Sequence, residues 1–434
     1  MDNSKFKFYS KLTRIELINF KSSKKGLLME NQNKGRGHDL KRRSFIKKSL
    51  AAAAAGTLPA PFIWPTGAHA APTVKMGILH SVTGTIAIAE KSVVDAEMLA
   101  VEEINAAGGV RGHQIEAIIE DGASDWPTFA EKARKLIGKD KVAAVQGCYT
   151  SASRKAVLPV FEKMKGLLYY PTYYEGLEIS PNIMYTAQEA TQSSIAATDW
   201  LFENRGETFY MVGSDYIWPR TTIKLSTMAL KRLGGKSLGE TFFPLGHIEW
   251  SSAINKIKAT KPKVVLNCVV GGSNVAFFKQ MKAAGIIDDP NITVLSLAVS
   301  EEEVSGIGRE NAAGSLTLMG YFQSLDNAAN RKFVSGFKAK YGQDRVTGDT
   351  LACGYTGVYL WKLACERADS FAVKDVVEAS SQLPIRAPEG NVWFHKDNHH
   401  LWKYARVGEF LPNGQVNMIY ESELIEPDPF PKVV

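Results

Sequence analysis

Hydroxyl and aromatic side chains gather directly after several apolar, β-rich runs of the sequence. The run Val142–Val145 is followed by Tyr149, Thr150 and Ser151, where a helical pattern begins. Free N–H groups at a helix start, together with serine and threonine hydroxyls, form a donor-rich pocket suited to a carbonyl oxygen. Ser151 or Ser153 is expected to cap this helix. Plain capping without any ligand is the alternative role.

Aromatic residues beside hydroxyl or carboxylate groups follow two further runs, Leu167–Tyr170 and Phe209–Val212. The candidate residues at these two places are Tyr170, Thr172, Tyr173, Tyr216 and Trp218. Phenol and indole rings combine a flat apolar area with one polar atom, which suits a small planar polar ligand. Core packing is the alternative, but three clusters at three strand ends favour a ligand site.

Two more strand ends offer weaker candidates. Gly271 follows the run Val264–Val270, and a glycine there permits close approach of the backbone to a ligand. Three glutamates begin at Glu301, after the run Thr293–Ala298. Acidic residues are favoured at a helix N-terminus by the helix dipole, so capping is their main expected role. We still count Glu301 as a candidate that reaches the ligand.

Enzyme chemistry has little support in the sequence. It contains no G-x-S-x-G elbow, no H-E-x-x-H metal motif and no nucleotide-binding glycine fingerprint after the first strand. His395, His399 and His400 cluster in a polar stretch, which we expect to be a solvated surface loop rather than a metal site. We therefore predict a protein that is not an enzyme and that has no cofactor and no metal.

Strand-like runs alternate with helical patterns through the body of the chain. The expected strands are Val74–Leu79, Ile115–Glu120, Val142–Val145, Leu167–Tyr170, Phe209–Val212, Val264–Asn267 and Thr293–Ser296, with helices such as Thr128–Ile137 and Ser273–Ala284 between them. Strands joined through helices imply parallel sheets covered on both faces. Two successive sets in 434 residues imply an α/β protein with two doubly wound lobes. Ligands of such sheets bind beyond the carboxyl ends of the strands.

The net charge of +7 is concentrated at the N-terminus, where residues 1–70 hold 14 Lys/Arg and 4 Asp/Glu. The rest of the chain is mildly acidic, so its overall charge gives no reason to expect nucleic acid as a partner. Arg42 and Arg43 precede an alanine-rich stretch that ends at Ala68-His69-Ala70. This order is typical of a cleaved twin-arginine export signal, and predicts a periplasmic protein. Met29 offers an alternative translation start.

The four cysteines show no zinc-ligand spacing and no C-x-x-C motif. Cys353 and Cys365 are expected on one helix, roughly 18 Å apart, which is too far for a disulfide. We expect four buried free thiols that act as small apolar residues.

Ordered motifs along almost the whole mature chain resemble one family. Residues 102–112 resemble the helix-to-turn signature of the leucine/isoleucine/valine-binding class of periplasmic proteins. More specific segments are Gly147–Ser151, Tyr170–Gly176, Gly213–Tyr216, Val269–Gly271 and Glu426–Pro429. Together they resemble the urea-binding subunit of urea ABC importers and its relative, the amide-sensing regulator of amidase expression.

The resemblance implies a type I periplasmic binding fold with two lobes and three chain crossings. The crossings are expected near Thr186–Glu189, Tyr321–Leu325 and Pro388–Gly390. Lobe one then comprises residues 73–187 and 325–388, and lobe two residues 188–324 and 389–432. The lobes are expected to close on the ligand, and the closed form to dock on the importer's membrane subunits.

Carried over to this sequence, the resemblance gives each candidate residue a role. The Tyr149 region and Ser151 hold the ligand carbonyl from lobe one, with Tyr170 and Thr172 beside it. Tyr216 and Trp218 close from lobe two.

One position departs from the family pattern. Gly272 stands where urea-binding relatives carry an acidic residue, which leaves urea and a short aliphatic amide both open. A branched-chain or other amino acid, an amide-sensing regulatory role and a hydrolase are the remaining alternatives.

Overall fold

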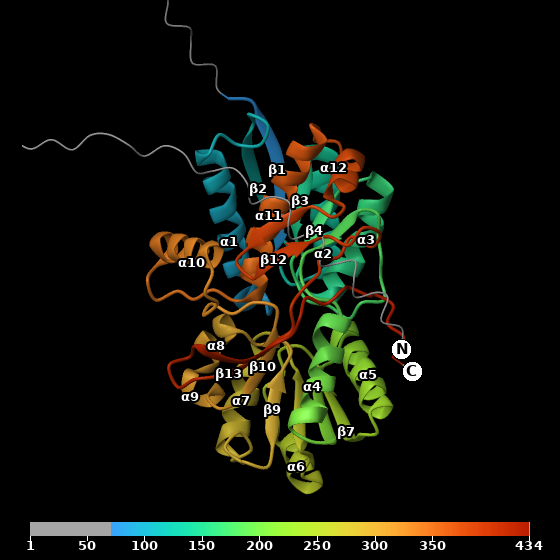
Figure 1. Ribbon diagram of the computed structural model, residues 1–434, viewed down its shortest axis with the longest axis vertical. Coiled ribbons are helices and arrows are strands. Elements are labelled where there is room, and N and C mark those ends of the chain that lie inside the picture. Colours follow the sequence, from blue (N-terminus) through green and yellow to red (C-terminus); the bar gives the residue numbers. More distant parts are fainter. Residues whose placement is uncertain (1–70, 434) are drawn as a thin grey trace, which may run out of the picture. The chain divides into compact units, whose positions relative to one another are not determined.

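The computed structural model describes residues 71–433, and the predicted export signal in residues 1–70 lies outside this range. Within it the chain forms two larger β-sheets and one hairpin, with helices packed around the sheets (Figure 1). The expected α/β class is confirmed. In the part described, no helix combines the length and apolar character needed to cross a membrane.

The first sheet has five strands, all parallel, in the order β2-β1-β3-β4-β5. These are β1 Thr73–His80, β2 Gln114–Asp121, β3 Ala144–Gly147, β4 Leu168–Tyr170 and β5 Ile183–Tyr185. Alternate residues enter different cores, since Tyr169 packs in one apolar cluster while Leu168 and Tyr170 pack in another. Both faces are therefore covered, which explains the continuous apolar runs in the sequence.

The second sheet has seven strands in the order β14-β13-β10-β9-β8-β6-β7. These are β6 Thr208–Ser214, β7 Lys236–Phe243, β8 Val264–Cys268, β9 Thr293–Ser296, β10 Leu316–Met319, β13 Arg406–Phe410 and β14 Val416–Glu421. The last two are antiparallel additions to an otherwise parallel sheet. The hairpin consists of β11 Pro384–Ala387 and β12 Gly390–Trp393.

Helices connect and cover the strands. They are α1 Ala87–Ala106, α2 Trp126–Arg134, α3 Ser151–Met164, α4 Ala196–Asn204, α5 Ile217–Arg232, α6 Ser251–Thr260, α7 Ser273–Ala283, α8 Glu301–Ile307, α9 Arg309–Ala312, α10 Ala328–Tyr341, α11 Asp349–Ala368 and α12 Val373–Ser380, with π-helical turns η3 Lys135–Asp140 and η4 Thr191–Ile195. In Figure 1 the orange α10 and α11 lie beside the blue α1, although they are distant in sequence. A late part of the chain thus returns to the first sheet.

The chain passes between the sheets more than once. It leaves the first sheet after β5 and enters the second at β6, then returns after β10 to place α10 and α11 against α1. Residues 390–401 stay beside the first sheet, because His400 bridges to Tyr185 and both Phe394 and Leu401 pack in the core beneath α11. The final passage into the second sheet ends at Arg406, the first residue of β13.

Two local predictions are corrected by the structure. β3 runs two residues later than the predicted Val142–Val145, because the buried polar Gln146 pairs with Ile78 inside the sheet. The histidine stretch is not simply a solvated loop: His400 is fully buried and stacks on Tyr185 with ring centroids 4.0 Å apart. Burial lowers the pKa of His400 to about 3, so its imidazole is neutral.

All four cysteines are buried and free, as predicted, and Cys353 and Cys365 share α11. Burial raises the pKa of each thiol above its ordinary value.

Candidate ligand-binding site

The loop after β3 brings a hydroxyl to the start of α3. Gly147 has φ of +154°, and a Cβ there would lie 2.2 Å from the Leu79 carbonyl oxygen, so the turn requires glycine. The helix cap is Thr150, whose side-chain oxygen accepts a bond from the Ser153 backbone N–H at 3.0 Å. The prediction that Ser151 or Ser153 is the cap is therefore wrong. Ser151 instead lies one residue inside the helix, where its hydroxyl is available for other partners.

A buried guanidinium lies directly behind Ser151. The Arg154 side chain is 0% exposed and donates to the Ser151 Oγ at 3.2 Å and to Glu178 Oε1 at 2.8 Å. The Ser151 hydroxyl donates to Glu175 Oε2 at 2.5 Å. Although burial alone raises the pKa of Glu178, the charge of Arg154 lowers it below its ordinary value. This network fixes the position of Ser151.

Sequence reasoning gave no role to Arg154 or Glu178. A usable signal was the spacing of Ser151 and Arg154, one turn apart on the predicted helix. The carboxylate partner lies 24 residues further along the chain, and no local pattern identifies it.

The segment after β4 supplies tyrosines and one unpartnered hydroxyl. Tyr170 donates to the Tyr149 carbonyl oxygen at 2.7 Å, and the Tyr149 and Tyr173 hydroxyl oxygens lie 3.5 Å apart. Thr172 is 3% exposed, and its Oγ1 has no hydrogen-bond partner among the described residues. A buried hydroxyl without a partner is costly in free energy, so it is a candidate for contact with a ligand.

Aromatic side chains from the two sheets meet across the strand ends. The rings of Tyr173 and Trp218 have centroids 5.4 Å apart at an angle of 54°. Burial and the neighbouring Tyr173 hydroxyl raise the pKa of Tyr216, the residue before α5. Gly271 follows β8 and lies against Ile86, in the segment between β1 and α1. A Cβ added to Gly271 would be 3.4 Å from the Cδ1 atom of Ile86. Tyr149, Tyr170, Tyr173 and Trp218 are therefore brought together.

The three glutamates at the start of α8 have three different environments. Glu301 accepts a bond from the Gln323 backbone N–H at 2.8 Å, while its Oε2 is buried without a partner among residues 71–433, and burial raises its pKa to about 8. Glu302 accepts a bond from Ser92 of α1. Glu303 completes a capping box with Ser300.

Glu303 is the glutamate whose charge acts on the tyrosines of the first sheet. Burial is the main cause of the raised pKa values of Tyr149 and Tyr173, and the Glu303 carboxylate adds to both. It was not among the residues singled out from the sequence, which gave no reason to prefer it over Glu301.

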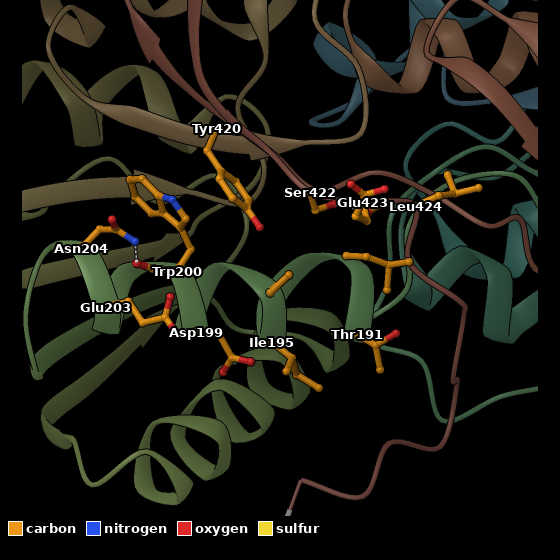
Figure 2. A pocket seen from close by; sticks show the side chains of 12 residues that line it. Thr191, Ile195, Asp199, Trp200, Glu203, Asn204, Tyr420, Ser422, Glu423 and Leu424 are labelled. Atoms are coloured by element: carbon orange, nitrogen blue, oxygen red, sulfur yellow. Dashed lines mark hydrogen bonds between the residues drawn. The ribbon is translucent and has the colours of Figure 1, made fainter. Parts of the chain in front are cut away.

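A separate groove of about 620 Å³ lies elsewhere on the second sheet (Figure 2). It is lined by η4, α4 and the segment from Tyr420 to Ile425, with Trp200 and Tyr420 as its aromatic walls. None of the candidate residues from the strand ends lines this groove.

A family model described as periplasmic binding protein domain matches residues 74–434. The chain belongs to this family. Its fold is that of the type I periplasmic binding proteins, an α/β fold with parallel sheets, as the sequence resemblance implied.

Individual relatives agree with this assignment. The chain is 23% identical over 397 residues to Leu/Ile/Val-binding protein homolog 7 of Brucella melitensis biotype 1, covering 87% of this chain and 96% of the relative. A solute-binding protein of an ABC transporter from Rhodopseudomonas palustris BisB5, in complex with 3,4-dihydroxybenzoic acid, has a TM-score of 0.74 at 21% identity over 82% of this chain and 98% of that one. A branched-chain amino acid transporter substrate binding protein from Streptococcus pneumoniae, with isoleucine, has a TM-score of 0.71 at 22% identity, covering 82% of this chain and 100% of that one.

One enzyme shares a short segment. Limonene hydroxylase of Geobacillus stearothermophilus is 34% identical over 117 residues, but these cover only 27% of this chain and 21% of that protein. Such a partial match does not assign enzyme activity to the whole chain.

Proposed function

We propose that this chain is an exported solute-binding protein that captures urea or a short aliphatic amide between two lobes and delivers it to the membrane subunits of an ABC importer. The proposed lobes follow the sequence prediction, residues 73–187 with 325–388 and residues 188–324 with 389–432. Residues 390–401, which pack beside the first sheet, are assigned to lobe one instead.

The contact between Tyr173 and Trp218 is the observation that carries this proposal. Their centroids lie 5.4 Å apart, so the aromatic walls of the two proposed lobes touch directly. Apolar contacts then run without interruption from Leu168 of β4 to Leu266 of β8. A ligand enclosed between walls that meet so closely must be small, and a planar molecule fits against ring faces.

The polar groups around this contact suit an amide. The Thr172 hydroxyl, which has no partner among residues 71–433, can donate to the carbonyl oxygen of the ligand, and the Ser151 hydroxyl can do so when it gives up its bond to Glu175. Tyrosine oxygens and the carboxylate of Glu303 can accept its N–H groups. Each N–H left unpaired in a closed site would cost about 1–3 kcal/mol, so these acceptors favour a ligand rich in N–H groups.

The proposed importer and the proposed cellular location rest on the family to which the chain belongs. The match to the periplasmic binding protein model supports a role outside the cytoplasm, and several solved neighbours are named as ABC transporter components. The paired Arg42 and Arg43 are the proposed export signal.

An amino acid is the second candidate ligand. Glu301 has a buried carboxylate oxygen without a partner among residues 71–433, and a ligand ammonium group would pair with it. The relatives named as Leu/Ile/Val-binding proteins favour the same alternative.

Isothermal titration of the mature chain with urea, acetamide and leucine separates the candidates. We expect saturable heat with urea or acetamide and none with leucine. Ser151→Ala should weaken that binding, whereas Ser335→Ala, an exposed serine on α10, serves as the matched control. Tight binding of leucine with no response to either amide would reverse the order of the two candidates.

A further inference from the structure

Charged side chains are buried where the chain passes between the two sheets. Lys403 is 0% exposed and forms an ion pair with Glu389, which is also 0% exposed. Its ammonium group lies 3.2 Å from the carbonyl oxygen of Thr186, directly after β5, and 3.3 Å from the Cys353 sulfur on α11. Lys403 lies on the last passage of the chain, so its ammonium group joins that passage to the first.

The second passage, which begins near Gly320, packs against the same lysine side chain. Asp349, the first residue of α11, accepts a bond from the Gly320 backbone N–H at 2.9 Å. A Cβ added to Gly320 would lie 3.1 Å from that Asp349 oxygen and 3.2 Å from the Lys403 Cε. The backbone of this passage is thus packed directly on both side chains.

Arg406 extends the network into the second sheet. Its guanidinium donates to the carbonyl oxygen of Gly320, to that of Glu389 at 2.9 Å and to the Glu421 carboxylate at 2.6 Å. Since Arg406 opens β13 and Glu421 ends β14, these bonds connect the passages to the antiparallel edge of the second sheet.

The charges in this cluster hold each other in place. Burial alone lowers the pKa of Lys403, but the neighbouring Cys353, Glu389 and Asp349 raise it above its ordinary value, so the ammonium stays charged. Burial raises the pKa of Asp349 to about 6, while Lys403 acts to lower it. Removing one partner of such a group leaves an uncompensated buried charge.

We propose that Lys403, on the third passage of the chain, is a positioning residue that sets the angle between the two lobes by bonding to the first passage and packing against the second. Hinge closure requires backbone rotation at a few residues between rigid bodies. A buried cation with directional bonds to Thr186 and Glu389, and with the Gly320 backbone packed against its side chain, permits few arrangements of those residues. Lys403 therefore limits the rotation to a narrow range in which the ligand groups of both sheets meet. The inference rests on the proposed two-lobe closure but not on the identity of the ligand.

Distance measurement between spin labels on the ligand-free mature chain tests this. Labels are attached to Glu131→Cys on α2 and Lys256→Cys on α6, both exposed positions, and the four native cysteines are buried. The double substitution Lys403→Met with Glu389→Gln removes both charges of the ion pair, and we expect the buried Asp349, which loses its cation, to take up a proton. We expect a wider distribution of interlobe distances and a shifted mean.

The matched control is Lys362→Met with Glu366→Gln, a partly exposed pair of the same residue types on α11. It should leave the distance distribution unchanged. If the Lys403 double variant does not fold, Lys403→Arg, which keeps the charge but changes its geometry, is measured instead and should shift the mean distance. A folded variant with the distribution of the parent chain would overturn the role of Lys403. Because no ligand is added, the distance measurement can be interpreted even if the titrations with amides show no binding.

Discussion

Thr172 offers a test in which stability and ligand affinity should change in opposite directions. Its Oγ1 is buried and has no partner among the described residues. An unpartnered buried hydroxyl costs roughly 1–3 kcal/mol, and Thr172→Val removes it while keeping the shape of the side chain. We expect the free energy of unfolding without ligand to rise by about 1 kcal/mol.

The same substitution should weaken ligand binding. If the hydroxyl donates to the ligand carbonyl, its loss costs about 1–2 kcal/mol, which corresponds to a roughly 5- to 30-fold higher dissociation constant. Binding is measured by isothermal titration. Unfolding is measured with guanidinium chloride, because urea is itself a proposed ligand.

Thr356→Val is the matched control. Its Oγ1 is also buried without a partner in the described part of the chain, but it lies within α11 and is not a candidate ligand contact. It should raise stability without changing affinity. An unchanged dissociation constant in Thr172→Val, with the stability gain present, would refute the assignment of this hydroxyl to the ligand.

Three further substitutions test the elements that support the site. Gly147→Ala should lower the free energy of unfolding by at least about 2 kcal/mol because its Cβ meets the preceding strand, whereas Gly272→Ala, with open space around it, should change thermal unfolding little. Burial raises the pKa of Glu301 from 4.5 to about 8, so the stability that this side chain contributes is present at low pH and is lost as the pH rises through that range. Between these pH values, the free energy of unfolding of the parent chain, measured with guanidinium chloride, should fall by up to about 1.4 kcal/mol per pH unit relative to that of Glu301→Gln. Parallel pH profiles of the two proteins would contradict this. Arg154→Met should lower the free energy of unfolding by about 3–5 kcal/mol, because it leaves the buried carboxylate of Glu175 without its cation and leaves Glu178 paired only with the more exposed Lys155. Arg220→Met, at an exposed ion pair, should have little effect on the melting temperature; equal effects would argue against the buried network.

The sequence allowed prediction of the fold because its signals are local. The runs that became β1, β6, β8 and β9 are mostly apolar and buried along most of their length, and burial on both faces of a parallel sheet produces that pattern. The rule that ligands bind at carboxyl strand ends then selected Tyr173 and Trp218, which the structure brings into contact.

Prediction failed where the deciding contact is distant in sequence. Arg154 looks like an exposed helix residue until Glu178 is placed beside it, and His400 looks solvated until Tyr185 covers it. The cap was misassigned because adjacent hydroxyl residues, Thr150 and Ser151, satisfy the same local rule, and only the backbone conformation distinguishes them.

The four buried thiols have a consequence for a protein that works in an oxidising compartment. A thiol attacks a disulfide as its thiolate, and the raised pKa values keep these sulfurs protonated at neutral pH. In the folded chain these thiols therefore do not take part in disulfide exchange. They can form incorrect disulfides only while the chain is unfolded. An export route that carries folded chains would remove even that interval of exposure.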